Sequence, residues 1–244
     1  MAFGKLFGIE KRRIFKTKPD NYETTNKYYF SDGSGEYSWQ SFYSATGKFY
    51  DDFGELNLID TWNTDSGGIG SASAANSVLS VTTGAAAGSF YCLYSIFKTK
   101  TLREAGTITF ECRMKKNLAN IGANNPRLFI GFARDYSPGD DDFYTPSYYF
   151  GGTAGVDFDA NEIACMINGN QVGADAVMND GSYYTLKIVL DDYSRTIKFY
   201  INGSLITSSS NPARDTEFLV GLKIDSVNTA DEQTMGIAWV KVTD

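Results

Sequence analysis

Apolar and polar residues alternate along much of this chain, and the pattern is clearest over residues 184–190. Side chains two positions apart lie on the same face of an extended strand, so this segment presents one apolar face. The apolar residues of that face are Tyr184, Leu186, Ile188 and Leu190. The alternation returns over residues 196–201, and a further apolar segment follows at 204–207. The pattern therefore predicts three consecutive strands.

Both connections between these strands contain the residues of tight turns. Residues 191–194 read Asp-Asp-Tyr-Ser, and the side chains of Asp and Ser hydrogen-bond to their own backbone in turns. Asn202 and Gly203 form the dipeptide that best tolerates the two positive φ angles of a type I′ turn. We therefore expect the three strands to form an antiparallel meander.

Alternating or short apolar runs continue through most of the chain after residue 50. The strands that they predict span residues 78–81, 90–94, 107–114, 128–133, 163–167, 218–224 and 237–242. The run at 128–133 is largely apolar, which is typical of a strand buried on both faces. Residues 66–73 and 84–88 are rich in Gly, Ser and Ala and are predicted loops. The length of the chain suits one all-β domain of about 200 residues with an appendage.

Several segments resemble, in the same order, segments of the concanavalin A-like lectin and glucanase sandwiches. FYDDFGELNLIDTWNTDSGG at residues 49–68 is similar to the opening segment of such domains, and NSVLSVTTG at 76–84 is similar to a strand that follows it. GTITFECRMKKN at 106–117 resembles the G-x-x-E-x-R-x-K strand of laminarinase-type glucanases. YYTLKIVLDDYSRTIKFYING at 183–203 and MGIAWVKVTD at 235–244 resemble a later strand–turn–strand unit and the closing strand. The resemblance implies a jelly-roll β-sandwich, laminarinase-like or LamG-like, over residues 49–244.

The resemblance does not extend to the catalytic motif of the glucanases. Those enzymes use an E-x-D-x-x-E strand whose two Glu act as nucleophile and general acid, and this motif is absent from the whole chain. The corresponding stretch, residues 127–135, contains no Glu, and Glu111 matches a residue that is not catalytic in those enzymes. The chain also has no histidine, which excludes Ser-His-Asp and Cys-His catalysis. We predict a non-enzymatic protein, with a diverged glycoside hydrolase as a remote alternative.

Charge divides the chain into a basic arm and an acidic body. Residues 1–19 carry a net charge of +5 (six Lys and Arg against Glu10), so the remainder carries −12 within a total of −7. The pattern of this segment predicts a short helix with one stripe of mainly apolar residues and with Gly4 and Gly8 in its interior, and so short a helix is marginal alone. We therefore predict that it orders only on a partner. The predicted partner-binding residues are Phe3, Leu6, Phe7, Lys11, Arg12 and Arg13.

Residues 20–48 form a second unit, which is rich in Tyr, Phe and Trp. Two interpretations stay open: a hairpin that covers one end of the sandwich, or a contact surface for another protein, since Tyr and Trp dominate interface anchors. The predicted domains are thus an anchoring arm at 1–48, divided into a basic-apolar part at 1–19 and an aromatic-rich part at 20–48, and the sandwich at 49–244.

Two further segments are candidate ligand sites. The segment 136–152 is expected to be a loop that offers aromatic platforms to a glycan, with the alternative that its rings pack beneath the loop. The candidate glycan-binding residues are Phe143, Tyr144, Tyr148 and Tyr149. Asp157, Asp159 and Asn161 place oxygen ligands at every second position, as an EF-hand loop does, but without its Gly and its bidentate Glu. Calcium is a hypothesis there, beside a plain solvated acidic loop; otherwise no cofactor is predicted.

The remaining features concern where the protein acts. No apolar stretch reaches the roughly 18 residues of a membrane span, and the apolar run at 3–9 is broken by Lys5, unlike that of a secretory signal. The odd number of cysteines and their apolar surroundings predict three free, buried thiols in a reducing compartment. We expect a protein made in a host cytoplasm and displayed on a virion.

The preferred hypothesis for function is a homo-oligomeric capsid decoration or head-fibre protein of a bacteriophage, anchored to other virion proteins (capsid or tail) through residues 1–48. The alternative is a carbohydrate-binding module or receptor-binding lectin that recognises a cell-surface glycan. Binding of nucleic acid is disfavoured by the −12 charge of the body.

Overall fold

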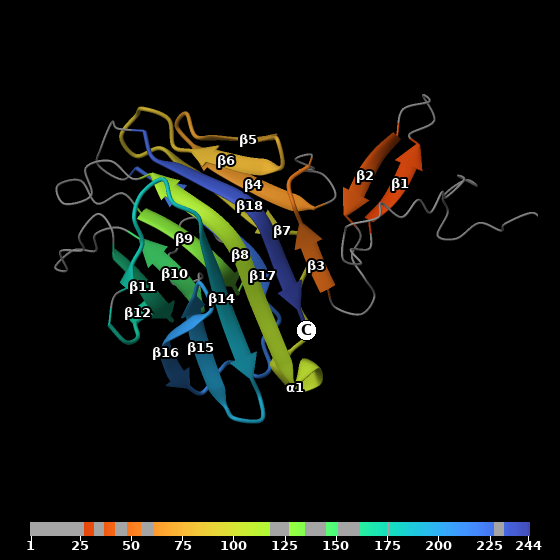
Figure 1. Cartoon of the computed structure of the whole chain (residues 1–244), viewed down its shortest axis with the longest axis vertical. Helices are drawn as coiled ribbons and strands as arrows, with labels where there is room; N and C mark the ends of the chain where they lie inside the picture. Colours follow the sequence, from red (N-terminus) through yellow and green to blue (C-terminus); the bar gives the residue numbers. More distant parts are fainter. Residues whose placement is uncertain are drawn as a thin grey trace, which may run out of the picture.

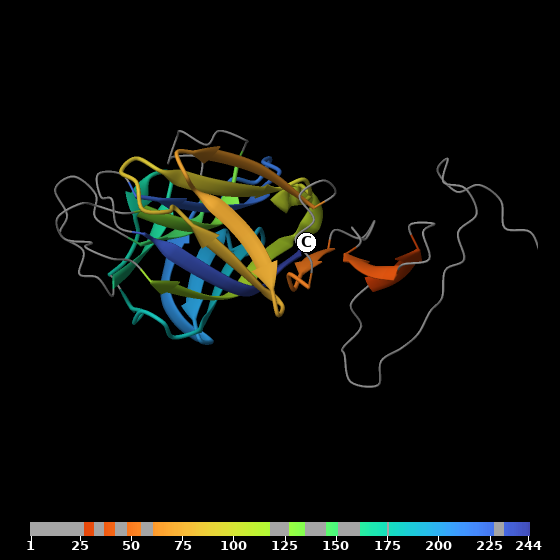
Figure 2. The same cartoon turned by 90° about the horizontal axis from the view of Figure 1, so that it is seen from above.

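The computed structural model describes residues 27–31, 37–41, 48–54, 61–117, 127–134, 145–150, 162–174, 176–226 and 232–244, with the backbone alone at 27–31, 37–41 and 48. Two eight-stranded antiparallel sheets make up most of this part of the chain. Figure 1 looks onto one sheet with the other behind it, and Figure 2 shows the same strands from above. We name the sheets after their central strands, β8 and β9.

The β9 sheet has the strand order β12-β11-β10-β9-β17-β7-β4, and β13 also pairs with β11. Its strands are β4 (Trp62–Gly67), β7 (Phe90–Ser95), β9 (Arg127–Ala133), β10 (Ser147–Phe150), β11 (Glu162–Ile167), β12 (Asn170–Gln171), β13 (Ala176–Val177) and β17 (Leu219–Asp225). Most residues of β9, β10 and β17 are buried on both faces, as the apolar run at 128–133 predicts.

The β8 sheet has the order β16-β15-β14-β8-β18-β6-β5, and β3 also pairs with β18. Its strands are β3 (Lys48–Asp51), β5 (Ser71–Ala75), β6 (Val78–Thr82), β8 (Thr107–Asn117), β14 (Tyr184–Asp191), β15 (Thr196–Ile201), β16 (Ser204–Ser210) and β18 (Thr234–Thr243). Buried and half-exposed residues alternate along β14 and β15, so this sheet has one core face and one solvent face.

A two-stranded sheet and one short helix complete the described secondary structure. The strands β1 (Lys27–Ser31) and β2 (Tyr37–Ser41) pair antiparallel with one another, as a hairpin requires. The short helix α1 (Leu102–Ala105) begins with a capping box, in which Thr101 and Glu104 hydrogen-bond to each other's backbone N–H groups. In the part of the chain that the structure describes, no helix is long and apolar enough to cross a membrane.

The core lies between the sheets and is built from the inward positions of the alternating strands. Rings from opposite sheets meet there: Phe110 lies 5.7 Å from Phe132, and Tyr148 lies 5.4 Å from Phe199, both centroid to centroid and edge-on. Cys92, Cys112 and Cys165 are free and buried, which confirms that part of the prediction. Burial raises the pKa of the Cys112 thiol well above 9.0, so this thiol stays protonated.

The first strand that joins a large sheet among the described residues is β3, which pairs with β18. Its last residue, Asp51, accepts hydrogen bonds from Trp62 Nε1 at 2.7 Å and from the Phe53 N–H at 2.8 Å. Asp51 is 4% exposed and Trp62 is fully buried, so this junction ties β3 to β4 inside the core. The domain boundary at residues 48 and 49 stays a prediction.

Most predicted strands are confirmed, and so is the turn at Asn202 and Gly203, whose φ angles are 50° and 81°. The predicted loop at 66–73 is wrong in part, because β4 extends to Gly67 and β5 begins at Ser71. Small residues occur there because the backbone of residue 90 lies close to that of residue 70. A Cβ on Gly70 would lie 2.4 Å from the Phe90 carbonyl oxygen.

Candidate functional site

The structure buries two of the residues expected to bind a glycan. Tyr148 and Tyr149 belong to β10, an interior strand of the β9 sheet, and are 0% and 1% exposed. Tyr148 points into the core, whereas Tyr149 packs on the opposite face against Phe129, with ring centroids 4.7 Å apart. Neither ring faces solvent, so these two do not form the exposed platform that the sequence predicts. All four residues of β10 are buried, so this part of the predicted loop is a core strand.

The other predicted site residues lie outside the described part of the chain. They are Phe3, Leu6, Phe7, Lys11, Arg12 and Arg13 of the arm, Phe143 and Tyr144, and the candidate calcium ligands Asp157, Asp159 and Asn161. Within the described residues, no group of three or more His, Cys, Asp and Glu side chains is placed to hold a metal ion.

The outer face of the β9 sheet is mainly apolar. β9 presents Arg127, Phe129, Gly131 and Ala133 to this face, and β10 presents Ser147 and Tyr149. Arg127 forms an ion pair with Asp225 on β17, at 2.7 Å between Nη2 and Oδ2. The positions of β9 and β10 that face outward therefore carry no carboxylate.

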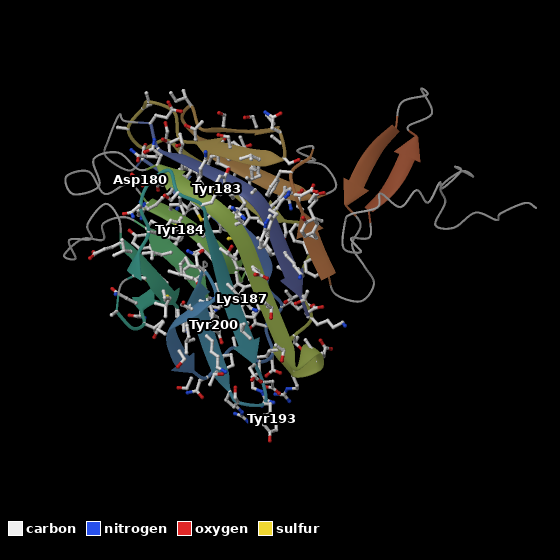
Figure 3. The ribbon with its side chains drawn as sticks, viewed as in Figure 1. Asp180, Tyr183, Tyr184, Lys187, Tyr193 and Tyr200 are labelled. Carbon is white, nitrogen blue, oxygen red and sulfur yellow. The ribbon has the colours of Figure 1, made fainter. Side chains whose placement is uncertain are left out.

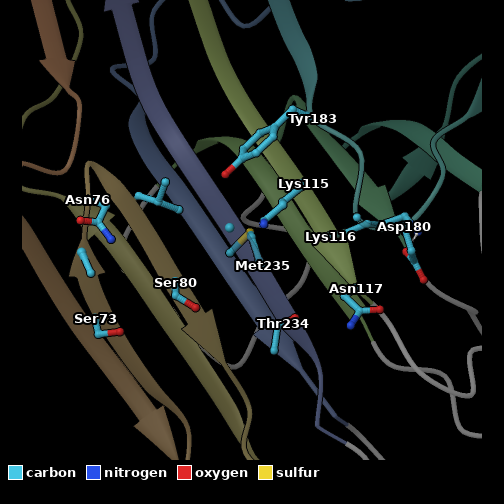
Figure 4. Close-up of a pocket in the computed structure, with 14 residues that line it drawn as sticks. Ser73, Asn76, Ser80, Lys115, Lys116, Asn117, Asp180, Tyr183, Thr234 and Met235 are labelled. Atoms are coloured by element: carbon cyan, nitrogen blue, oxygen red, sulfur yellow. Dashed lines mark hydrogen bonds and ion pairs between the residues drawn. The ribbon is translucent and has the colours of Figure 1, made fainter.

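A groove with a volume of about 670 Å³ lies on the outer face of the β8 sheet. Its floor is formed by neighbouring residues of β8 and β18, one side by the β5–β6 hairpin, and the other by residues 180–183 before β14 (Figure 4). The polar side chains that line it include Ser73, Asn76, Ser80, Asn117, Asp180 and Thr234. Hydroxyl, amide and carboxylate groups thus surround one open groove.

Tyr183 supplies the exposed aromatic ring of the groove and is 36% exposed. Lys115 Nζ lies 5.2 Å from the centroid of this ring, and Arg113 Cζ lies 5.5 Å from it. Both distances fall within the roughly 6 Å range of cation–π contacts. Tyr183 lies at the start of β14, and the exposed Tyr193 lies at its other end (Figure 3).

Gly236 makes room for the Lys115 side chain on the floor of the groove. The two residues are cross-strand partners in β18 and β8. A Cβ on Gly236 would lie 3.0 Å from Lys115 Cε and 3.2 Å from Cγ, so the aliphatic part of Lys115 lies across the glycine. The ammonium group is thereby directed into the groove (Figure 4).

The segment that carries Tyr183 is held to β8 by a buried lysine. The Lys116 side chain is 0% exposed and forms an ion pair with Asp180. The Gly181 N–H donates to the Lys116 carbonyl at 2.9 Å, and the Asn179 N–H donates to the Tyr184 hydroxyl at 3.1 Å. A buried ammonium group needs such a partner because its desolvation is costly. These contacts place Tyr183 beside Lys115.

The sequence did not reveal this groove, because the motif-like segment GTITFECRMKKN at 106–117 predicts a strand and not which other strands become its neighbours. The residues of the groove come from the β5–β6 hairpin, β8, the segment before β14, and β18, which strand pairing alone brings together. The sequence does contain one relevant signal: apolar and polar residues alternate along β8, and this alternation places Arg113 and Lys115 on the solvent face of the strand.

A scan against models of protein families found no match, and a search of curated proteins found no similar sequence. Many solved structures share the fold. The carbohydrate recognition domain of Emp47p superposes with a TM-score of 0.57 at 12% identity, over 82% of this chain and 96% of that one. The β-glucanase of Bacillus licheniformis gives 0.57 at 17% identity, over 82% and 100%. Peanut lectin gives 0.59 at 10% identity, over 81% and 97%.

These similarities establish the fold class that the sequence predicts. The chain contains an all-β, two-sheet antiparallel sandwich of the concanavalin A-like type. Lectins and glucanases share this fold, so the fold alone does not define what the protein does.

Proposed function

We propose that this protein is a non-enzymatic carbohydrate-binding protein, which recognises a glycan in the groove on the outer face of the β8 sheet. The observation that carries the proposal is the exposed Tyr183 ring inside a groove surrounded by hydroxyl, amide and carboxylate side chains.

The groove has the chemistry that a sugar requires. The apolar face of a pyranose packs on an aromatic ring, while its hydroxyls need donors and acceptors around the edge. Tyr183 supplies the ring, and Asn76, Asn117 and Asp180 supply amide and carboxylate partners. A volume of about 670 Å³ lies within the usual range of ligand sites and suits a short oligosaccharide.

The structural neighbours support a carbohydrate as the ligand. They include a carbohydrate recognition domain, a lectin and a β-glucanase. At 10–17% identity they share the fold with this chain, so their names suggest a class of ligand and not a position for the site.

The absence of catalysis is supported by the outer face of the β9 sheet. Glycoside hydrolysis in the glucanases needs a pair of carboxyl groups that flank the scissile bond. The outward positions of β9 and β10 instead hold Phe129, Gly131, Ala133, Ser147 and Tyr149 beside Arg127, and the carboxylate of Asp225 on the neighbouring strand β17 is ion-paired with that arginine. We expect no release of reducing sugar from β-glucans, and turnover that disappears on mutation of a single Glu would contradict this.

The biological setting that we propose is display on a virus particle, with residues 1–48 as the anchor. Support comes from the sequence: a +5 segment of 19 residues precedes a body of opposite charge. A pull-down with and without residues 1–48 tests this, and we expect the partner to be lost with the arm. Retention of the same partner by the shortened chain would contradict the anchoring role.

The carbohydrate-binding proposal is tested with the full chain on a glycan array, comparing Tyr183→Ala with Tyr193→Ala. Tyr193 is 98% exposed and lies in the turn after β14, so it is a matched control for loss of a surface ring. We expect the first variant to lose glycan binding and the second to keep it, at unchanged melting temperature. Binding that survives in Tyr183→Ala would place the site elsewhere.

A further inference from the structure

The outer face of the β8 sheet is basic, although the chain as a whole has a net charge of −7. The basic side chains at solvent-facing strand positions are Arg113, Lys115, Lys187, Lys198 and Lys241. The acidic side chains at such positions of the same described strands are Glu111 and Asp191. Cations therefore outnumber anions on this face, against the charge of the whole protein.

Two of these cations flank the aromatic ring of the groove. Arg113 and Lys115 both lie against Tyr183, and within the described residues neither has a carboxylate within ion-pair distance. Lys116, by contrast, is buried and paired with Asp180. The exposed ring of the groove thus lies beside two cations, Lys115 in the groove lining and Arg113 next to it, and neither has an ion-pair partner among the described residues.

Resting on the proposed function, we propose that the groove selects acidic glycans, whose sugars carry carboxylate or sulfate groups. A sugar ring that stacks on Tyr183 would bring an anionic substituent toward Lys115 and Arg113. Charge-assisted hydrogen bonds to such an anion are about twice as strong as neutral ones, and Arg binds it with two parallel N–H donors. A neutral glycan would leave both cations without partners.

The alternative occupant of a basic, aromatic face is a single-stranded nucleic acid, whose bases also stack on tyrosine. The groove favours the glycan because its lining offers one ring of 36% exposure surrounded by hydroxyl and amide groups, and the Lys187–Tyr200 pair on the same face lies outside it. Nucleic acid is therefore an outcome of the test rather than the proposal.

The test is calorimetric titration of the full chain with four probes. These are a neutral β-glucan oligosaccharide, an oligogalacturonate, a heparin-derived oligosaccharide and a single-stranded DNA oligonucleotide. We expect at least one acidic oligosaccharide to bind about tenfold or more tightly than the neutral one, as one or two charge-assisted hydrogen bonds would give. Raising the ionic strength from about 0.1 M to about 1 M should weaken this binding, because the Debye length falls to about 3 Å.

The variants are Arg113→Gln and Lys115→Gln, with Lys98→Gln as the matched control. Lys98 is an exposed lysine in the loop between β7 and α1, outside the groove, so its loss changes the net charge equally. We expect each of the two variants beside Tyr183 to weaken acidic-glycan binding about fivefold or more, and the control to leave it unchanged. Lys115→Arg should retain most of the affinity because it keeps the charge.

The outcomes separate this inference from the proposed function. Equal binding of neutral and acidic oligosaccharides, lost in Tyr183→Ala, would overturn the acidic specificity and keep the glycan-binding function. Binding of no oligosaccharide would overturn both. Two other results would show a general polyanion effect and overturn the inference. One is that Lys98→Gln weakens acidic-glycan binding as much as Arg113→Gln and Lys115→Gln do. The other is that DNA binds as tightly as the acidic oligosaccharide and is weakened equally by those two variants.

Discussion

The hydroxyl of Tyr148, on β10, lies 2.7 Å from the backbone carbonyl oxygen of Tyr200, on β15 in the opposite sheet. It also lies 2.9 Å from the Lys187 carbonyl oxygen on β14. The register of β15 against β16 shifts between Phe199 and Tyr200, so the Tyr148 hydroxyl lies beside a β-bulge. This single phenol therefore connects the two sheets through backbone acceptors.

We predict that Tyr148→Phe lowers the free energy of unfolding by about 1–3 kcal/mol, because two half-buried carbonyl groups lose a donor while the ring stays packed on Phe199. Urea denaturation measures this. Tyr193→Phe is the control, since that side chain is 98% exposed and its hydroxyl is solvated. Equal stability of wild type and Tyr148→Phe would show that the inter-sheet hydrogen bond contributes nothing net.

The same phenol predicts a loss of stability at alkaline pH. Burial raises the pKa of Tyr148 well above 10.0, so the folded protein keeps this proton while the unfolded chain releases it near pH 10. The stabilisation is thus complete below about pH 10 and declines above it, by about 1.4 kcal/mol per pH unit. Tyr148→Phe lacks this decline, so the stability difference between the two proteins should narrow above pH 10. A stability difference between the two proteins that stays constant up to about pH 11.5, well above the ordinary tyrosine pKa of about 10, would refute the prediction.

The fold was accessible from the sequence where one face of a strand is apolar and the other polar. Leu186, Ile188 and Leu190 are buried as the alternation predicts, and the adjacent turn follows from Asn202 and Gly203. β10 was missed because it is short, is buried throughout and lies between segments rich in Asp, Gly and Pro. Periodicity cannot mark a strand that is buried on both faces.

The groove was not accessible in the same way, because it depends on register between distant strands. Gly236 faces Lys115 only because β18 pairs with β8 in a register that shifts between Ile237 and Trp239. No local pattern fixes that bulge, and the motif-like segments that contain Tyr183 and Lys116 predict strands, not a binding site. The outward position of Lys115 could be predicted from the sequence, whereas its neighbours in the groove depend on how the strands pair.

A further prediction concerns the junction between β3 and β4. Asp51→Asn replaces one carboxylate oxygen with an amide donor, which faces either the Trp62 indole N–H or the Phe53 N–H. We expect a loss of about 2–3 kcal/mol in the free energy of unfolding, as for buried hydrogen bonds to a charged acceptor. Asp52→Asn is the neighbouring control and should cost less, since its hydrogen bond to the Gly54 N–H is 3.3 Å long and exposed. Equal losses would show that Asp51 is not a specific acceptor.

The last prediction tests whether Gly236 positions Lys115. In Gly236→Ala the new Cβ would lie 3.0 Å from Lys115 Cε, so the side chain must shift by a few tenths of an ångström while its charge is kept. We expect glycan affinity to fall by about 1 kcal/mol, roughly fivefold, since charged hydrogen bonds are sensitive to geometry. Stability should be unchanged or slightly higher, because Gly in a strand costs about 0.5–1 kcal/mol relative to Ala. Gly54→Ala is the control, because its Cβ would meet only Asp52 Oδ1, at an ordinary 3.5 Å. Calorimetric titration and thermal melting separate the two effects, and an unchanged affinity would show that the glycine has no part in directing the ammonium group into the groove.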